Sequence, residues 1–412
     1  MFTFSKHVMA VGGFLLIWLD TCRADTLTIP CEASQLASNS QYGMHIHKFH
    51  DPRFVPKGEF GSWRLWDSGV TWGQVQPARD GWNFRRLDLA LDIGERLGLE
   101  VGITLGPTPE WASARPSEHS LMGLGAAAEP LNLSDWDIYV ETLAKRYKGR
   151  LKFYEIWNEP STSAFFTGSV ETMVELARRA YKIIKAIDPS ALVLTPSPAK
   201  MASIRWLTSY IEAGGGQYAD ILGFHFYTDQ DHPDALIELI SRVKDVVRPK
   251  FPNMPIWNTE SGLRFAPIRD QSLNSQQGIP SSSAHLATWV ILGSCMGLGR
   301  FFYYAWDDAN VGLVDDRQGG SERITLAGWR AARRWLLGSK LSRCERAGNV
   351  WKCFLAKENG DFAFIGWGTI PMTVDDLGEH SVVSVEDLVG NTAFSSAHSI
   401  TLTMSPTLVR YR

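Results

Sequence analysis

The sequence predicts a (β/α)8 TIM barrel followed by a small C-terminal antiparallel β domain. Between about residues 40 and 338, short apolar runs alternate with amphipathic stretches, an order typical of a parallel sheet covered by helices. No G-x-G-x-x-G motif follows the first run, which argues against an open dinucleotide-binding sheet. Eight candidate strands favour a closed barrel: Tyr42–Phe49, Gly61–Leu65, Glu100–Leu105, Leu151–Ile156, Ala191–Thr195, Ile221–Phe226, Pro255–Asn258 and Arg300–Ala305.

The stretches between these runs carry helical periodicity. The clearest predicted helices are Asn83–Leu97, Ser134–Tyr147 and Ser169–Ile187. In the second, apolar residues recur at the spacing that places them on one helical face. We expect Ser134 to cap its start and Gly149 to stop the chain after its end. These helices would form the outer layer of the barrel.

The rhythm changes after residue 338. Short strand-like runs punctuated by turn residues replace the helical period: Trp351–Ala356, Phe362–Trp367, Ser381–Val385 and Ser399–Met404. We therefore expect residues 339–412, with part of 25–40, to form a small β domain packed on a barrel of residues 40–338. Ala112–Leu133 form a longer irregular insertion after the third strand, and so on the active-site face.

Composition excludes several kinds of partner. The chain has 412 residues, with 44% hydrophobic and 21% charged side chains, which is ordinary for a protein with a full core. A net charge of −3 provides no field that would attract nucleic acid or an acidic membrane surface. The 16 tryptophans are unusual, and they suit both large cores and sugar-stacking sites.

The N-terminal segment, residues 1–24, reads as a signal peptide. Lys6 precedes a twelve-residue apolar run, Val8–Leu19, and Ala24 offers a cleavage point. This run is shorter than the roughly 20 residues that span a bilayer, although an uncleaved anchor is the alternative. Lipidation of Cys22 is disfavoured by the nearby Asp20. We expect a secreted or periplasmic protein without an integral membrane span after cleavage, acting as a monomer.

Four cysteines remain beyond Cys22, and their spacing does not resemble a zinc site. Cys344 and Cys353 flank eight residues that read as a hairpin turn. In an oxidising compartment this pair would form a local disulfide, and two reduced thiols are the alternative.

Two glutamates fall where predicted strands end. The fourth strand runs into Asn158-Glu159-Pro160, and the seventh into Thr259-Glu260. In a parallel barrel, catalytic side chains sit at these carboxyl ends, where the loops converge. A single glutamate there is more often a structural ion-pair partner. Two of them across the mouth meet the requirement for glycoside hydrolysis: retaining enzymes hold their carboxyl groups roughly 5–5.5 Å apart, and inverting enzymes about 6.5–9.5 Å apart.

These motifs resemble those of the clan A glycoside hydrolases, which are retaining and carry catalytic glutamates on strands four and seven. The resemblance implies that Glu159 is the acid/base and Glu260 the nucleophile. It further implies that Arg64 bonds the nucleophile and Asn158 holds the sugar 2-hydroxyl. The remaining matches are His225 and Tyr227 on strand six and Trp306 as the aromatic floor of the sugar site.

Within the clan, the segments from Trp72 to Pro77 and from Thr108 to Ala112 look most like family 39. The short β tail and the signal peptide look more like its branch acting on bacterial exopolysaccharide, so we expect a polysaccharide or oligosaccharide substrate. An exo-acting β-xylosidase-like enzyme and a transglycosylase stay open as alternatives. A non-catalytic sugar-binding barrel is disfavoured because both glutamates, Arg64 and Tyr227 are present. No metal or cofactor is expected.

The chemistry also predicts an order of pKa values. Glu159 must hold a proton at rest, so burial and the Glu260 charge should raise its pKa. Glu260 must stay ionised, which the charge of Arg64 and a hydrogen bond from Tyr227 would favour.

Further polar and aromatic residues lie near the predicted mouth. On the first strand His47 lies nearer the carboxyl end than His45, and is the expected sugar contact. Asp307 and Asp308 either bind sugar hydroxyls or belong to a solvated loop. We expect one of Trp66, Trp72 and Trp111 to stack on a sugar ring.

Overall fold

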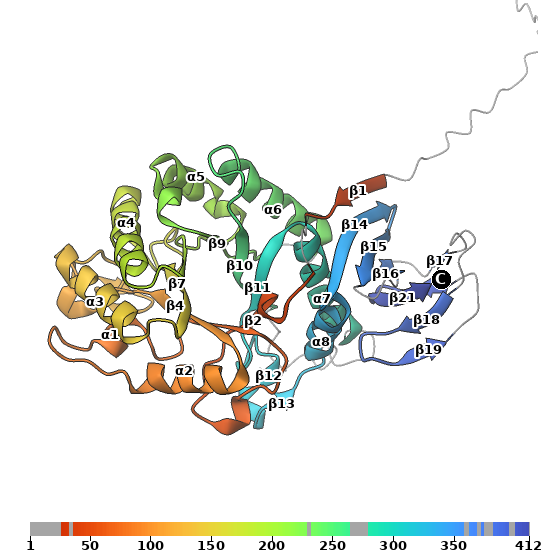
Figure 1. Ribbon diagram of the computed structural model, residues 1–412, viewed down its shortest axis with the longest axis horizontal. Coiled ribbons are helices and arrows are strands. Elements are labelled where there is room, and N and C mark those ends of the chain that lie inside the picture. Colours follow the sequence, from red (N-terminus) through yellow and green to blue (C-terminus); the bar gives the residue numbers. More distant parts are fainter. Residues whose placement is uncertain are drawn as a thin grey trace, which may run out of the picture.

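The computed structural model describes residues 26–32, 36–228, 232–263, 279–357, 362–368, 372–374, 382–394 and 400–411. The predicted signal peptide, residues 1–24, lies outside these ranges. Figure 1 shows a barrel of strands and helices beside a separate C-terminal sheet, drawn in blue.

Eight parallel strands form the barrel, as the sequence predicted. They are β2 (Tyr42–Met44), β3 (Ser62–Leu65), β4 (Glu100–Leu105), β7 (Leu151–Ile156), β8 (Leu192–Leu194), β9 (Leu222–Phe224), β10 (Ile256–Ser261) and β11 (Leu298–Tyr303). Their order in the sheet is β8-β7-β4-β3-β2-β11-β10-β9. Parallel bridges from Leu194 to Ile221 and from Ala199 to His225 join the two ends and close the barrel.

The outer helices are the short α1 (Trp72–Val75), α2 (Arg85–Leu97), α3 (Leu133–Arg146), α4 (Val170–Ile187), α5 (Ile204–Glu212), α6 (Pro233–Val247), α7 (Ile279–Cys295) and α8 (Thr325–Leu336). Ser169 caps α4 by accepting a hydrogen bond from the Thr172 N–H. The expected cap of α3 is wrong by two residues, because the helix begins at Leu133 with Asn132 in the cap position. Gly149 follows α3 with a positive φ of 76°.

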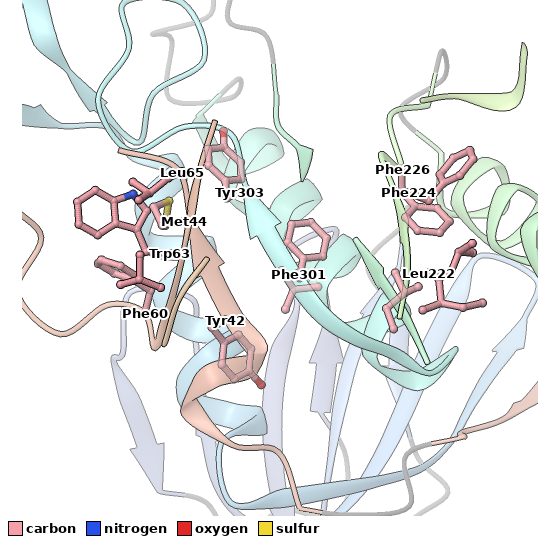
Figure 2. Packing of buried hydrophobic residues seen from close by; sticks show 14 of the residues in the cluster. Tyr42, Met44, Phe60, Trp63, Leu65, Leu222, Phe224, Phe226, Phe301 and Tyr303 are labelled. Atoms are coloured by element: carbon pink, nitrogen blue, oxygen red, sulfur yellow. The ribbon is translucent and has the colours of Figure 1, made fainter. Parts of the chain in front are cut away.

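Side chains on the barrel strands alternate between two cores. Outward-facing residues such as Met44, Trp63 and Phe301 pack beneath the helices, and Figure 2 shows part of this cluster. Inward-facing residues fill the lower barrel with a second cluster: Phe153, Leu194, Ile221, Trp257 and Phe302. Glycines make room for the two phenylalanine rings, since a Cβ at Gly43 would meet Phe302 at 2.2 Å and one at Gly102 would meet Phe153 at 2.1 Å.

The C-terminal region is an antiparallel sheet, as predicted, with more strands than the sequence showed. Its order is β1-β14-β15-β16-β21-β18-β19. The bounds are β1 (Thr26–Pro30), β14 (Ser339–Ala347), β15 (Val350–Lys357), β16 (Phe362–Gly368), β18 (Val382–Glu386), β19 (Thr392–Phe394) and β21 (Thr407–Tyr411). A further pair joins β17 (Met372–Val374) to β20 (Ile400–Leu402). β1 therefore brings the N-terminal part of the described chain onto the C-terminal sheet (Figure 1).

Short strand pairs decorate the loops, with β5 (His119–Ser120) on β6 (Gly123–Leu124) and β12 (Val314–Asp315) on β13 (Ser321–Glu322). The β5–β6 pair is a hairpin within the predicted insertion after β4.

One disulfide lies within the C-terminal sheet and a second joins that sheet to the barrel. Cys344 and Cys353 face each other across β14 and β15 and are bonded. A second disulfide joins Cys31, just after β1, to Cys295 at the end of α7. Sequence spacing did not reveal this pair, because 264 residues separate its partners. Among the described residues, no helix is both long and apolar enough to cross a membrane.

Candidate active site

The two predicted catalytic glutamates come together at the carboxyl ends of the strands. Glu159 follows β7, and Glu260 lies near the end of β10, which continues to Ser261 rather than ending at Asn258 as predicted. One oxygen of each carboxylate and a ring nitrogen of His225 all lie within 4.8 Å of one another. This puts the glutamates on the short side of the two carboxylate separations that glycoside hydrolases use.

The backbone after β7 is strained in a way that presents Glu159. Trp157 and Glu159 have positive φ values of 75° and 43°, a region that non-glycine residues rarely occupy. Hydrogen bonds on both sides fix this conformation, from the Trp157 N–H to the Leu105 carbonyl (3.1 Å) and from the Glu159 N–H to the Ser197 carbonyl (3.0 Å). Strain of this kind concentrates at functional sites, where the surrounding structure holds it.

Arg64 connects three acidic or amide side chains. It is fully buried, and each part of its guanidinium has a partner. Nε donates to Glu155 (2.5 Å), one terminal nitrogen to Glu260 (3.0 Å) and the other to the amide oxygen of Asn158 (2.8 Å). The planar fork of arginine suits such multiple recognition and fixes the relative positions of its acceptors. Arg64 and Asn158 thus lie where the sequence placed them, next to the two glutamates.

Glu155 is a buried site residue that the sequence reasoning missed. Besides Arg64, it accepts hydrogen bonds from the hydroxyls of Thr104 (2.5 Å) and Ser197. A buried charge must be paired and hydrogen-bonded, and these three donors satisfy that requirement. The available signal was a glutamate in the strand Leu151–Ile156 at a position in step with the inward-facing Phe153.

His225 and Tyr227 contact the glutamates, in line with their predicted place. The Tyr227 hydroxyl donates to Glu260 (3.0 Å), and Nδ1 of His225 lies 2.9 Å from Glu159 and 3.9 Å from Glu260. Glu159, His225 and Glu260 are residue types that can bind a cation, but both Glu260 oxygens already accept hydrogen bonds from Arg64 and Tyr227.

The pKa values of the two carboxyl groups lie in the opposite order to the prediction. Burial raises the pKa of Glu159, but the hydrogen bond and charge of His225, helped by Arg64, outweigh burial and lower it below its usual range. For Glu260, burial dominates over the charges of His225 and Arg64, and its pKa is raised. The sequence did not predict that His225 contacts Glu159, and this contact reverses the order of the two pKa values.

A second polar cluster lies beside the glutamates. Nε2 of His47 contacts Asp67 (3.0 Å), and its backbone N–H donates to Asp307 (2.7 Å). Burial alone lowers the pKa of His47, but the hydrogen bond and charge of Asp67 and the charge of Asp307 raise it to about 9. Burial raises the pKa of Asp67, yet His47 and the hydroxyl of Tyr304 bring it well below its usual range. Asp307 is buried, so its side chain does not belong to a solvated loop.

The aromatic residue that reaches this cluster is Tyr304 rather than Trp306. Trp306 is 6% exposed and packs in the outer hydrophobic core. The Tyr304 ring packs edge-on against His45 (5.1 Å) and His47 (5.3 Å). His45 is fully buried and its Nε2 lies 3.1 Å from the Thr259 carbonyl, so His45 supports the strand ends from within.

Comparison with known proteins identifies the family. Residues 64–276, more than half of the chain, match the sequence family described as "Glycosyl hydrolases family 39". The chain belongs to this family. A beta-xylosidase from Caldicellulosiruptor saccharolyticus is 27% identical over 245 residues, which are 55% of this chain and 49% of that protein. The chain therefore spans about half the length of this curated relative.

Solved structures agree on the fold. A family 39 glycoside hydrolase from Bacteroides cellulosilyticus superposes with a TM-score of 0.71 at 16% identity, covering 91% of this chain and 81% of that one. A monomeric beta-xylosidase from Caulobacter crescentus gives a TM-score of 0.63 at 16% identity, covering 92% and 97%. At such identities the likeness shows the shared barrel and appended sheet.

The family 39 match spans most of the predicted site residues: Arg64, Asn158, Glu159, His225, Tyr227 and Glu260. His47 and Trp306 lie outside the matched segment, just after the first and last strands of the barrel.

Proposed function

We propose that this family 39 protein is a retaining glycoside hydrolase that cleaves a polysaccharide by double displacement. The observation that carries the proposal is the short separation of Glu159 and Glu260, which leaves little room for the water that an inverting mechanism places between its carboxylates.

In this mechanism Glu260 is the nucleophile. Its carboxylate, held by Arg64 and Tyr227, attacks the anomeric carbon and forms a glycosyl ester while the bond to the leaving oxygen breaks. Glu159 gives its proton to that oxygen. In the second step Glu159 takes a proton from water, the water oxygen attacks the anomeric carbon, and the ester bond breaks to release the sugar and restore Glu260.

The proton on Glu159 depends on His225. A protonated Glu159 can donate to Nδ1 of a neutral His225, whereas an imidazolium at the same 2.9 Å contact favours the carboxylate. A bound sugar would exclude water from Glu159 and favour its neutral form. The contact with His225 therefore affects how readily Glu159 holds the proton that it donates to the leaving oxygen.

The substrate we propose is a bacterial exopolysaccharide, reached by a secreted or periplasmic monomer. Two disulfides support an oxidising compartment. A second candidate is an exo-acting β-xylosidase-like activity, which the named relatives favour. The same covalent intermediate would also allow transfer to a sugar acceptor.

The test combines Glu260→Ala and Glu159→Ala with a panel of secreted bacterial polysaccharides and aryl β-xylosides. Each change should lower turnover by at least roughly 10²–10⁴-fold. Azide added to Glu260→Ala should give a glycosyl azide of inverted configuration, and azide added to Glu159→Ala one of retained configuration. Glu171→Ala, exposed at the start of α4, is the control. Turnover within about tenfold of the wild type in either catalytic variant, or products of inverted configuration from the wild type, would show the assignment to be wrong.

A further inference from the structure

A large open cavity lies between the loops that follow β3 and β4. Its volume is roughly 680 Å³, in the range of small-ligand sites. It contains neither catalytic glutamate. Its walls come from the α1 segment, the Pro107–Trp111 segment and the β5–β6 hairpin: Thr71, Gly73, Pro77, Pro107, Thr108, Pro109, Glu110, Trp111, Pro116, Met122, Gly123, Leu124 and Ala126.

Trp111 is the aromatic residue in this wall, and its ring is held in place. The indole N–H donates to the Gln76 carbonyl (3.0 Å), Trp72 packs edge-on (6.1 Å), and the Arg79 guanidinium lies over the ring at 5.2 Å. Of the three tryptophans considered for sugar stacking, Trp66 and Trp72 are 4% and 0% exposed. Trp111 is half-buried and lines the cavity, so it is the one able to offer a ring to a ligand.

The cavity lies on the same edge of the barrel as the catalytic glutamates. The Trp72 N–H donates to the Gly106 carbonyl (3.1 Å), which joins the cavity wall to the end of β4. A Cβ at Gly106 would touch the Trp157 ring at 2.8 Å, so the same wall packs against the strained turn that presents Glu159. The cavity wall therefore adjoins the turn that presents Glu159.

We propose that this cavity is a distal subsite for a neutral sugar unit of the substrate, with Trp111 as its stacking platform. The inference rests on the proposed glycosidase function and makes it specific for oligomeric substrates. The exposed Glu110 carboxylate is a polar partner for sugar hydroxyls, whereas the hydroxyls of Thr71 and Thr108 already donate within the protein. Glu110 is the charged residue among the lining residues, and Arg79 is turned to the Trp111 ring and to Asp135, so an acidic sugar would meet repulsion.

The experiment is isothermal titration calorimetry in a Glu260→Gln background that does not turn over. The probes are neutral xylo-, cello- and manno-oligosaccharides of one to six units, with oligogalacturonates of the same lengths as acidic counterparts. Affinity should rise with chain length for at least one neutral series. Trp111→Ala should reduce the affinity for the longer members by roughly five- to tenfold, and Trp111→Tyr should keep most of it. Trp206→Ala, which removes another half-buried tryptophan stacked on Tyr210 of α5, is the matched control.

The outcomes separate this subsite from the proposed function. If the wild type cleaves glycosides but Trp111→Ala keeps the full length dependence, or loses monomer and hexamer binding equally, the subsite is wrong and the function stands. Absence of any length-dependent neutral binding, or an equal gain with oligogalacturonates, also overturns the subsite. If no glycoside is cleaved yet neutral oligosaccharides bind in a Trp111-dependent way, the function fails and the subsite stands.

Discussion

Two buried arginines lie at opposite ends of the barrel interior. One is surrounded by polar acceptors and the other by aromatic rings. Arg64, at the carboxyl end, donates to Glu155, Glu260 and Asn158 and has no exposed surface. Arg300, at the other end, bonds Glu100, and its guanidinium lies 4.1 Å from the centre of the Trp257 ring. One of its terminal nitrogens is buried without a partner in the described structure.

This contrast shows that one end of the barrel interior serves packing while the other positions the proposed reacting groups. The Arg300 end is apolar, and its arginine covers aromatic rings much as another large side chain would. At the Arg64 end, the charge is shared among carboxylates, one of which is the proposed nucleophile. Buried charges can determine where a reacting group lies and how easily it ionises.

Removing Arg64 should have the largest effect. Arg64→Met leaves Glu155 and Glu260 as buried carboxylates without their cation, so we expect a loss of about 3–5 kcal/mol in unfolding free energy. Turnover should fall by roughly 10³-fold because Glu260 loses its positioning partner. Denaturant unfolding and glycoside assays measure the two effects. Arg300→Met is the matched control and should cost less stability and little activity; equal losses in the two variants would contradict the comparison.

The apolar end should respond in stability alone. Phe153→Ala removes a fully buried ring that packs against Trp257 (5.5 Å) and Phe302 (5.6 Å), and we expect a loss of about 3–5 kcal/mol in unfolding free energy. The folded fraction should keep kcat within a few-fold of the wild type. A large drop in kcat at a temperature where the variant is folded would show that the two ends are coupled.

Glu155 tests whether the buried charge acts on the reaction through Arg64. Glu155→Gln keeps the shape and removes the negative charge, so kcat should fall roughly 10–100-fold with little change in KM. Without this charge Arg64 acts more strongly on Glu260, whose pKa should fall, and the acidic limb of kcat/KM should move to lower pH. Thr104→Val, which removes only a hydroxyl donor, should leave that limb in place. A lower kcat with an unmoved limb would assign Glu155 a structural role only.

The smallest predicted effect depends on pH. The pKa of His47 is about 9 in the folded protein, above its unfolded value of about 6.5, so its ion pair with Asp67 stabilises fully below about pH 6.5 and is lost as pH rises through 9. The pKa of Asp67 is depressed below its unfolded value of about 4, so the stabilisation by its carboxylate is complete above about pH 4 and is lost as the pH falls further. His47→Asn should therefore cost about 2 kcal/mol at pH 6 and much less at pH 10. An equal cost at both values, by denaturant unfolding, would exclude this ion pair.

The sequence predicted the barrel and the placing of both glutamates because strand periodicity and motif position are local signals. It did not predict that His225 faces Glu159, that Glu155 supports Arg64 or that Tyr304 reaches His47. These contacts join residues from different strands, and their geometry depends on the register in which the strands pair. The sequence assigned part of residues 25–40 to the C-terminal domain, but it did not predict the pairing of β1 with β14 or the partner of Cys31, because these contacts span most of the chain.

The pairing of β1 with β14 also bears on modularity. The C-terminal sheet looks like an appended unit in Figure 1, yet its edge strand β1 is synthesised before the barrel. β1 can pair with β14 only after Ala347 has been synthesised, and Cys31 can form its disulfide only after Cys295 has been synthesised. A shortened protein that ends before Ser339 would leave β1 as an unpaired edge, which invites association with other chains. Any transplant of this barrel onto another scaffold should therefore treat β1 and the sheet as one inseparable part.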